Sequence, residues 1–242
     1  MFEGPTTATV GDIVATDFRT AAVFERFGID FCCGGGVSLA DACRAAAVEP
    51  TTVIDALRTL PPSSKSDDDV SAWPVERLID HIVSTHHAYV RSSLPRIDRH
   101  LAAIEAAHGS RHPELGRMRA CFDTLAIELT QHMIKEERVL FPYIRELAAR
   151  SRGCEWAPSP FGSVENPIRM MEREHREAAD HLGMIRQLTA GFSTPADGCA
   201  TYGVCMAELA EFERDLHWHV HLENNVLFPA ALRLEPPSCL RP

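Results

Sequence analysis

The sequence predicts an all-α protein, in which a small helical N-terminal domain precedes an up-down-up-down four-helix bundle. Two observations predict this fold. Apolar residues recur at helical spacing over four long stretches in the C-terminal part, and over shorter stretches before them. Between the two parts lies Pro61–Asp69, a polar, proline-led segment that is typical of a linker. We therefore expect domains at 1–60 and 75–235, joined by a linker at 61–74.

Four short helical patterns make up the expected N-terminal domain. One begins at Val10, and a second covers 20–27 and ends at Gly28, a residue suited to a helix C-cap. A third begins at Ser38 and a fourth at Pro50. A domain of roughly 60 residues is only marginally stable alone. We therefore expect it to dimerise or to dock on the rest of the chain.

The bundle is predicted from longer patterns. Pro74 suits the first position of a helix, and Pro95 is a possible kink within it. A proline-containing loop is expected at 153–162. The four helices are expected at 74–108, 113–149, 166–188 and 197–234. Short connections between long helices favour the antiparallel order.

Composition narrows the classes of function. The chain has 242 residues, with 24 Lys and Arg against 34 Asp and Glu, which gives a net charge of −10. This balance argues against binding nucleic acid through a basic surface. No stretch approaches the roughly 18 apolar residues of a membrane span. The start of the chain lacks the regions of a signal peptide. We therefore expect a cytoplasmic protein whose eight cysteines are thiols rather than disulfides.

Histidine is abundant in this acidic chain, with twelve residues, and two segments share a pattern. His132 precedes Glu136, and His219 precedes Glu223, by four residues, and each segment is followed by Val-Leu-Phe-Pro. Residues four apart project from one helix face. Two His and two Glu from two helices predict a di-metal carboxylate site in the bundle interior. Imidazole with carboxylate suits iron, with manganese and zinc as alternatives.

The other two helices are expected to supply one histidine each. On the first, helical phase favours His87 over its neighbour His86, at the level of the His132 motif. On the third, His175 shares a stripe with apolar residues, whereas His181 is its competitor. His108 lies about 30 Å along the helix from His87 and is expected to be a helix C-terminal cation. With two His per metal and both carboxylates bridging, positions stay open for a small ligand or an oxo or hydroxo bridge.

Carboxylates near these ligands have expected roles as well. Glu128 lies four residues before His132 on the same inward face, so it is a candidate outer-sphere or proton-relay group. Glu174, beside His175, is another candidate. The alternative for both is a salt bridge. The remaining histidines are expected at the surface, at caps or beside the ligands: His81, His100, His112, His181, His217 and His221.

Cys32 and Cys33 are adjacent and are followed by three glycines, Gly34 to Gly36. Free backbone amides in such a setting lower a thiol pKa. The pair is a candidate for disulfide exchange, for carrying iron or sulfur, or for binding a cluster, and the alternative is two small buried side chains. The other cysteines are expected to be packing residues: Cys43, Cys121, Cys154, Cys199, Cys205 and Cys239.

Together, the Asp-Phe-Cys-Cys-Gly-Gly-Gly segment at 30–36 and the two His/Glu motifs resemble the iron–sulfur cluster repair family, the "repair of iron centres" (Ric) proteins. That family combines an ScdA-type N-terminal domain with a hemerythrin-like di-iron domain, and the resemblance spans about 8–234. The main departure is the connection at 150–166, which is longer than usual and carries Cys154 and Trp156. The resemblance implies these iron ligands: His87, His132, Glu136, His175, His219 and Glu223.

The resemblance also implies a function. Family members are cytoplasmic, dimeric in some cases, respond to nitric oxide and oxidative damage, and are associated with restoring damaged iron–sulfur clusters. We expect iron donation to damaged iron–sulfur proteins or their scaffolds, assisted by Cys32 and Cys33. The alternative is reduction of nitric oxide to nitrous oxide at a diferrous site, with Glu128 delivering protons. We expect a homodimer and no nucleic-acid or membrane partner. The ligand count disfavours oxygen carriage.

Overall fold

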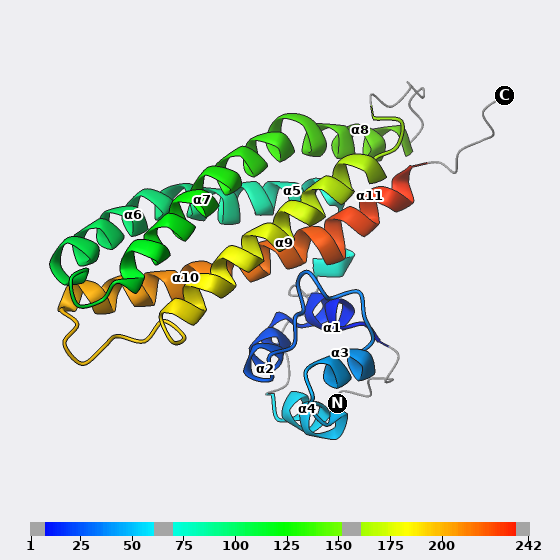
Figure 1. Cartoon of the computed structure of the whole chain (residues 1–242). Coiled ribbons are helices and arrows are strands. Elements are labelled where there is room, and N and C mark those ends of the chain that lie inside the picture. Colours follow the sequence, from blue (N-terminus) through cyan, green and yellow to red (C-terminus); the bar gives the residue numbers. More distant parts are fainter. Residues whose placement is uncertain (1–7, 61–69, 152–160, 236–242) are drawn as a thin grey trace. The chain divides into compact units, whose positions relative to one another are not determined.

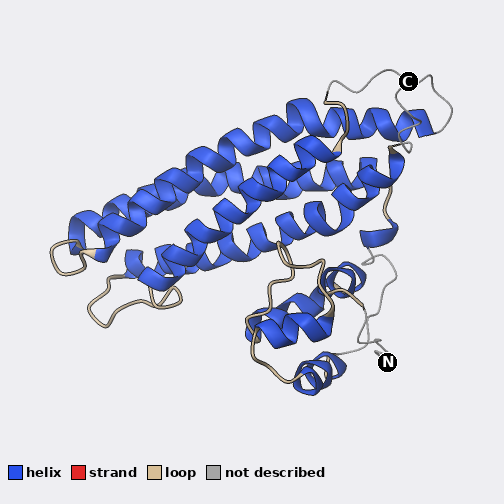
Figure 2. Cartoon of the chain, turned by 45° about the vertical axis from the view of Figure 1, so that its right-hand side comes forward, coloured by secondary structure: helices blue, strands red, loops and turns tan. Residues whose placement is uncertain are grey.

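The computed structural model describes residues 8–60, 70–151 and 161–235. Helices and loops account for these residues, apart from one isolated bridge between Thr9 and Ser38 (Figure 2). The all-α prediction is confirmed. None of the helices in the described ranges is long and apolar enough to cross a membrane. Most of the predicted linker and of the loop with Cys154 and Trp156 lies outside the described residues.

The chain forms two units, which are described separately. The bundle unit consists of residues 81–143 and 165–216, and the N-terminal unit of residues 1–80, 144–164 and 217–242. The domain boundaries expected from the sequence stay a prediction.

Four antiparallel helices build the bundle unit (Figure 1). They are α6 (Ala88–His108), α7 (Glu114–Lys135), α9 (Glu165–Leu188) and α10 (Ala200–His221), the last as far as residue 216. α7 packs against both α6 and α9. α10 meets α6 through His100 and Glu208, and it meets α9 through Arg186 and Glu213. Each helix therefore has two antiparallel neighbours, as the up-down-up-down order requires.

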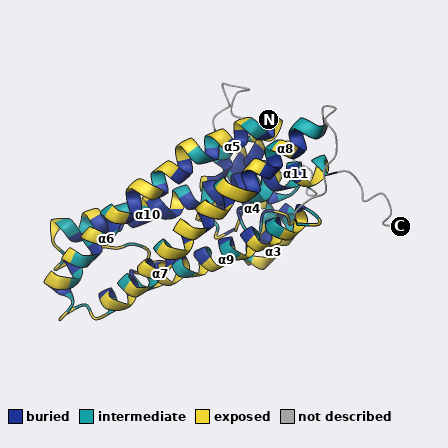
Figure 3. Ribbon diagram, turned by 90° about the horizontal axis from the view of Figure 1, so that it is seen from above, coloured by how far each residue is buried: buried dark blue, intermediate teal, exposed yellow. Residues whose placement is uncertain are grey.

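The interior of the bundle unit follows the predicted apolar stripes (Figure 3). On α7, Leu115, Met118, Phe122, Leu125 and Leu129 recur at helical spacing and are 0–3% exposed. Burying each such side chain contributes about 1.5–3 kcal/mol. This packing fixes the rotation of the helices, and with it the direction in which the polar residues of the same faces point.

Three helices contain a π-helical segment that the helical periodicity did not predict. These segments are η4 (Ile82–His87), η5 (Glu136–Leu140) and η6 (Leu222–Leu227). α5 (Val75–His81) precedes η4, α8 (Phe141–Ser151) follows η5, and α11 (Phe228–Leu234) follows η6. Pro142 and Pro229 lie just after η5 and η6, where each removes one backbone donor and favours a local widening of the helix. π segments are frequent at functional sites, and these three carry His87, Glu136 and Glu223.

The N-terminal unit contains the short helices predicted at the start of the chain. They are α1 (Val10–Thr16), η1 (Phe18–Thr20), α2 (Ala21–Arg26), α3 (Leu39–Ala45) and α4 (Pro50–Arg58), followed by η3 (Val70–Ala72). The Thr9 and Ser38 side chains accept hydrogen bonds from backbone amides of α1 and α3. Gly28, with φ of 65°, follows α2 as a C-cap.

The N-terminal helices pack on the chain's last long helix within this unit. α1 contacts η6 and η3. The rings of Phe18 and Trp218 lie 3.9 Å apart, and His221 contacts the Phe31 carbonyl oxygen at 3.3 Å. Docking on the rest of the chain was one of the two expected ways to stabilise so small a domain, and the structure shows it. The homodimer stays a prediction.

Candidate metal centre

Four side chains of the bundle unit converge at one level of the bundle. His87 on η4 and His132 on α7 place their Nε2 atoms 3.4 and 3.3 Å from Glu136 Oε2. His132 Nε2 also lies 3.0 Å from His175 Nε2 of α9. All four side chains are 0–3% exposed. Three helices of the bundle thus direct two kinds of metal-binding atom, imidazole nitrogen and carboxylate oxygen, at one point.

Two further carboxylates hold the outer nitrogens of these imidazoles. Glu137 Oε1 lies 2.6 Å from His87 Nδ1, and Glu174 Oε2 lies 3.0 Å from His132 Nδ1. A carboxylate at this distance keeps the proton on Nδ1 and leaves Nε2 with the lone pair that a metal uses. The inward nitrogens are therefore prepared as ligands. The choice of His87 over His86 agrees with this geometry, since His86 Nδ1 lies 2.9 Å from Asp215 instead.

Electrostatics keep both outer carboxylates ionised. Hydrogen bonding to His132 and the nearby Lys135 ammonium lower the pKa of Glu174 to about 2, although burial opposes them. Burial alone would raise the pKa of Glu137, but His87 and Arg91 outweigh it and lower that pKa. The Arg91 guanidinium and the Lys135 ammonium each lie 2.5 Å from their carboxylate oxygen. Each imidazole is thus held by an anion that is itself held by a cation.

The central residue is Glu136, whose side chain is fully buried. A buried carboxylate is costly unless a cation or hydrogen bonds compensate its charge. A metal ion among the inward nitrogens would neutralise this charge and use their lone pairs. The donor set of imidazole and carboxylate, without thiolate, fits iron, manganese or zinc. The residues present therefore fit the metal that the sequence predicts.

A second His/Glu pair lies in the N-terminal unit. His219, on α10, and Glu223, on η6, are 0–1% exposed, and His219 Nε2 lies 3.0 Å from Glu223 Oε1. The four-residue spacing is that of His132 and Glu136, and again the glutamate belongs to a π segment that ends just before Phe-Pro. The two predicted motifs therefore have the same local structure.

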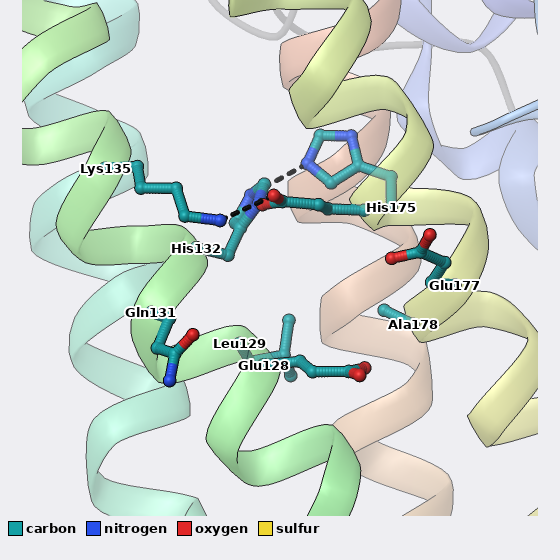
Figure 4. A pocket seen from close by; sticks show the side chains of 9 residues that line it. Glu128, Leu129, Gln131, His132, Lys135, His175, Glu177 and Ala178 are labelled. Carbon is teal, nitrogen blue, oxygen red and sulfur yellow. Dashed lines mark hydrogen bonds and ion pairs between the residues drawn. The ribbon is translucent and has the colours of Figure 1, made fainter.

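A small pocket opens beside the imidazoles of the bundle unit (Figure 4). Its volume is about 80 Å³, which is room for water or a diatomic molecule. The figure shows the rings of His132 and His175 turned toward each other at this pocket. The residues that line it come from α7 and α9: Glu128, Leu129, Gln131, His132, Lys135, Glu174, His175, Glu177 and Ala178. The opening admits water or a diatomic molecule to the imidazoles.

The inward orientation predicted for Glu128 is wrong. Its side chain is 46% exposed and lies 3.2 Å from His181 Nε2 in an ion pair on the bundle surface. A residue four positions before His132 is turned by about 40° around the helix. Because His132 already points toward α9, this turn brings Glu128 to the outer edge of the α7/α9 interface. It lines the mouth of the pocket but not the core.

Glu137 is the contributor that the sequence reasoning missed. It directly follows Glu136 in the segment His-Met-Ile-Lys-Glu-Glu, and the missed signal was this doubled glutamate. The second glutamate is turned toward the neighbouring α6 face, where it meets His87 and Arg91. Glu174, the other predicted outer-sphere candidate, contacts the Nδ1 atom of His132.

Histidines outside the candidate metal centre have other environments. His108 is buried, and Arg111 donates to its Nδ1 at 3.2 Å. His108 lies in the last turn of α6, as predicted, and its role as a helix C-terminal cation stays a prediction. His112 contacts both Glu114 and Asp197 at 3.0 Å. His221 is fully buried.

The cysteines differ in exposure. Cys32 is buried and Cys33 is half-buried, and the metal-binding atoms of Asp30 and of both cysteines lie within 4.8 Å of one another. Cys43 and Cys205 are buried, as expected of packing residues. For Cys199, exposed at the start of α10, that expectation is wrong. Cys154 and Cys239 lie outside the described residues.

Comparison with known proteins agrees with this architecture. Residues 6–61 match the family model ScdA_N, described as a domain of unknown function, and residues 78–231 match the hemerythrin HHE cation binding domain. Proteins named iron-sulfur cluster repair protein YtfE are 34% identical over 230 residues in Dickeya chrysanthemi and 33% identical over 227 residues in Musicola paradisiaca. Each alignment covers 94% of this chain and 97% of the relative. The chain therefore belongs to the hemerythrin HHE family, and within it to the iron–sulfur cluster repair proteins of the YtfE type.

Proposed function

We propose that the two His/Glu motifs contribute to one centre that holds two iron ions, bridged by carboxylates and by an oxo or hydroxo group. Four ligands would come from the bundle unit: His87, His132, Glu136 and His175. His219 and Glu223 would complete the set, because α10 begins in the bundle unit and carries His219 near its end. The match of one family model across residues 78–231 supports a single domain.

We infer that the protein takes part in the repair of damaged iron–sulfur clusters by donating iron. The observation that carries this proposal is the composition of the buried site, in which nitrogen and oxygen ligands converge without a thiolate. A set of nitrogen and oxygen ligands binds ferrous iron less tightly than a thiolate site binds soft metals. The pocket beside His132 and His175 gives a small chelating group access to the site. Iron is then the cargo, and damaged iron–sulfur proteins or their scaffolds are the recipients. The curated relatives are named for iron-sulfur cluster repair, which supports the repair function.

Cys32 and Cys33 are proposed to assist the transfer. Cys33 is half-buried and hence within reach of a recipient, whereas Cys32 is buried behind it. The cytoplasmic location and the homodimer are part of the same proposal, and they rest on the family resemblance.

Incubation of the iron-loaded protein with an enzyme whose iron–sulfur cluster has been inactivated tests the proposal. Activity should return with the wild type and not with Glu136→Ala protein purified and loaded in the same way. Cys33→Ser should slow the recovery without lowering the iron content. If free ferrous iron restores activity and the iron-loaded protein does not, iron donation is excluded.

The pocket favours a second candidate function, the reduction of nitric oxide. Its volume fits a diatomic ligand beside His132 and His175. Two NO molecules require two electrons and two protons to give nitrous oxide and water, and a diferrous centre would bind NO and supply these electrons. Glu128, which lines this pocket beside His181, is the residue proposed to deliver protons to the reaction. Gas analysis of the reduced protein mixed with NO tests this function, and no nitrous oxide would exclude it.

A further inference from the structure

The loop that carries the cysteine pair is held by a side chain from the last long helix. Within the N-terminal unit, the Asn225 amide on η6 donates to the carbonyl oxygens of Phe31, at 3.2 Å, and of Cys32, at 2.9 Å. Phe31 and Cys32 are buried, where an unpaired carbonyl group would cost free energy. One amide thus fixes two successive carbonyl groups of the loop.

Two glycines allow the Asn225 side chain to come this close. A Cβ atom on Gly11, in α1, would lie 2.6 Å from Asn225 Oδ1, and one on Gly35 would lie 2.5 Å from the same atom. The Gly11 amide also donates to the Gly35 carbonyl oxygen at 2.8 Å. The amide is therefore enclosed by backbone from α1 on one side and from the cysteine loop on the other. Side chains larger than hydrogen at these glycines would push it out.

The opposite edge of the loop is held by Asp30. Its Oδ1 accepts hydrogen bonds from the backbone amides of Cys32, at 2.9 Å, and of Cys33, at 3.0 Å. The loop is therefore gripped at its amides by Asp30 and at its carbonyls by Asn225. Interaction with the Cys33 thiol and burial raise the pKa of the Cys32 thiol. The two thiols therefore differ, because Cys33 is only half-buried whereas Cys32 is buried and protonated.

We propose that Asn225 is the positioning residue of the cysteine pair, which holds the loop so that Cys33 is presented and Cys32 stays buried. This inference rests on the proposed role of the pair in iron transfer. Asn225 lies two residues after Glu223 on the same π segment. One turn of helix thus carries both a candidate iron ligand and the clamp of the thiol loop.

Alkylation of the metal-free, full-length protein tests the clamp. In the wild type, iodoacetamide should modify Cys33 about tenfold faster than Cys32, as read by peptide mass spectrometry, because the half-buried Cys33 thiol is more accessible than the buried Cys32 thiol. Asn225→Asp keeps the shape of the side chain but replaces the donating amide by a carboxylate, which the carbonyl oxygens of Phe31 and Cys32 repel. The loop should then open, and Cys32 should react about tenfold faster than in the wild type. The matched control is Asn224→Ala, whose amide reaches Cys32 O only at 3.5 Å. It should leave both rates within about twofold of the wild type. Unchanged rates in a folded Asn225→Asp protein would overturn the inference.

A double-mutant cycle gives a second, independent measure. Gly11→Ala should lower the melting temperature in the wild type, because its methyl group meets the Asn225 amide. In an Asn225→Ala background that contact is gone, so Gly11→Ala should cost less. Equal losses in both backgrounds would contradict the enclosure of the amide.

Neither measurement uses iron, so the two proposals can fail separately. If Asn225→Asp releases Cys32 but iron transfer is unchanged, the positioning role stands and the thiols have no part in transfer. If the alkylation rates are unchanged, the positioning role fails whatever happens to transfer.

Discussion

The two ends of the bundle unit both carry buried histidines, but they use them differently. At one end, His87, His132 and His175 turn their Nε2 atoms toward one another and toward Glu136. At the other end, His108 accepts a hydrogen bond from Arg111, and its ring lies edge-on to Tyr202 at 5.6 Å.

His112, near the second end, also has ordinary polar partners. It lies between two carboxylates, Glu114 at the start of α7 and Asp197 in the turn before α10. His112 meets its carboxylates in ordinary ion pairs, whereas the first end gathers several imidazole nitrogens around one buried carboxylate. Convergence of inward nitrogens, rather than burial of histidine, therefore distinguishes the end with the candidate metal centre.

The largest expected effect comes from replacing Glu136 by Gln. The variant should lose bound metal, and with it the stabilisation by metal of about 2.7 kcal/mol at a metal concentration one hundred times the dissociation constant. Metal-free Glu136→Gln should be at least as stable as the metal-free wild type, because a buried charge is removed. Thermal unfolding of both proteins with and without metal measures the stabilisation by metal and the stability of the metal-free forms. A variant that metal still stabilises would show that Glu136 is no ligand.

A somewhat smaller loss is expected from the carboxylates that orient the imidazoles. Glu174→Ala and Glu137→Ala should each weaken metal affinity by about 10- to 100-fold, because His132 or His87 loses its orienting partner. Competition with a coloured chelator measures the affinity. The control is Glu208→Ala, which removes a similar 2.6 Å contact to His100 far from the centre. Equal losses of metal affinity in all three variants would show that Glu137 and Glu174 have no special role in orienting the imidazoles.

At the second end, the exposed thiol of Cys199 provides a pH test. A hydrogen bond from His108 and backbone amides of α10 lower the pKa of Cys199 to about 7, whereas burial raises that of Cys205 to about 12. Alkylation of Cys199 should therefore rise with a midpoint near pH 7, with Cys205 unreactive as an internal control. His108→Ala should move the midpoint toward about 8.5, the value of a free thiol. A midpoint that does not move would exclude the contribution of His108.

The smallest expected effect concerns His112. Hydrogen bonds to Asp197 and Glu114 raise its pKa above the ordinary value of 6.5. A raised histidine pKa stabilises the folded protein below the unfolded pKa, and this contribution is lost as the pH rises through the folded pKa. The imidazole signal in an NMR titration should have its midpoint above 6.5, and Asp197→Asn should lower it. A wild-type midpoint at or below 6.5 would contradict the ion pairs.

The sequence was sufficient for the parts of the site that obey helical periodicity. The four-residue spacing of His132 and Glu136 predicts that both reach the interior, and the register of His87 separates it from His86. Both predictions work because apolar packing sets the rotation of each helix about its axis. The chemistry of the donor set then follows from residue type alone.

What the sequence did not predict depends on neighbouring helices. Glu128 satisfies the periodicity, yet His181 on α9 draws it into a surface ion pair. The sequence pattern around Glu137 is that of a surface charge, and only the approach of the helix that carries His87 and Arg91 gives it partners. The π segments are also not predicted, because a regular period of 3.6 residues does not describe the helix next to Pro142 and Pro229.

Metal analysis of the purified protein tests the central claim most directly. Wild-type protein should contain about two iron ions per chain, as a di-iron bundle with carboxylate ligands does. Both Glu136→Ala and His219→Ala should lose them while remaining helical by circular dichroism. One zinc ion per chain, or full iron content in His219→Ala, would contradict the proposal that the two motifs share one centre.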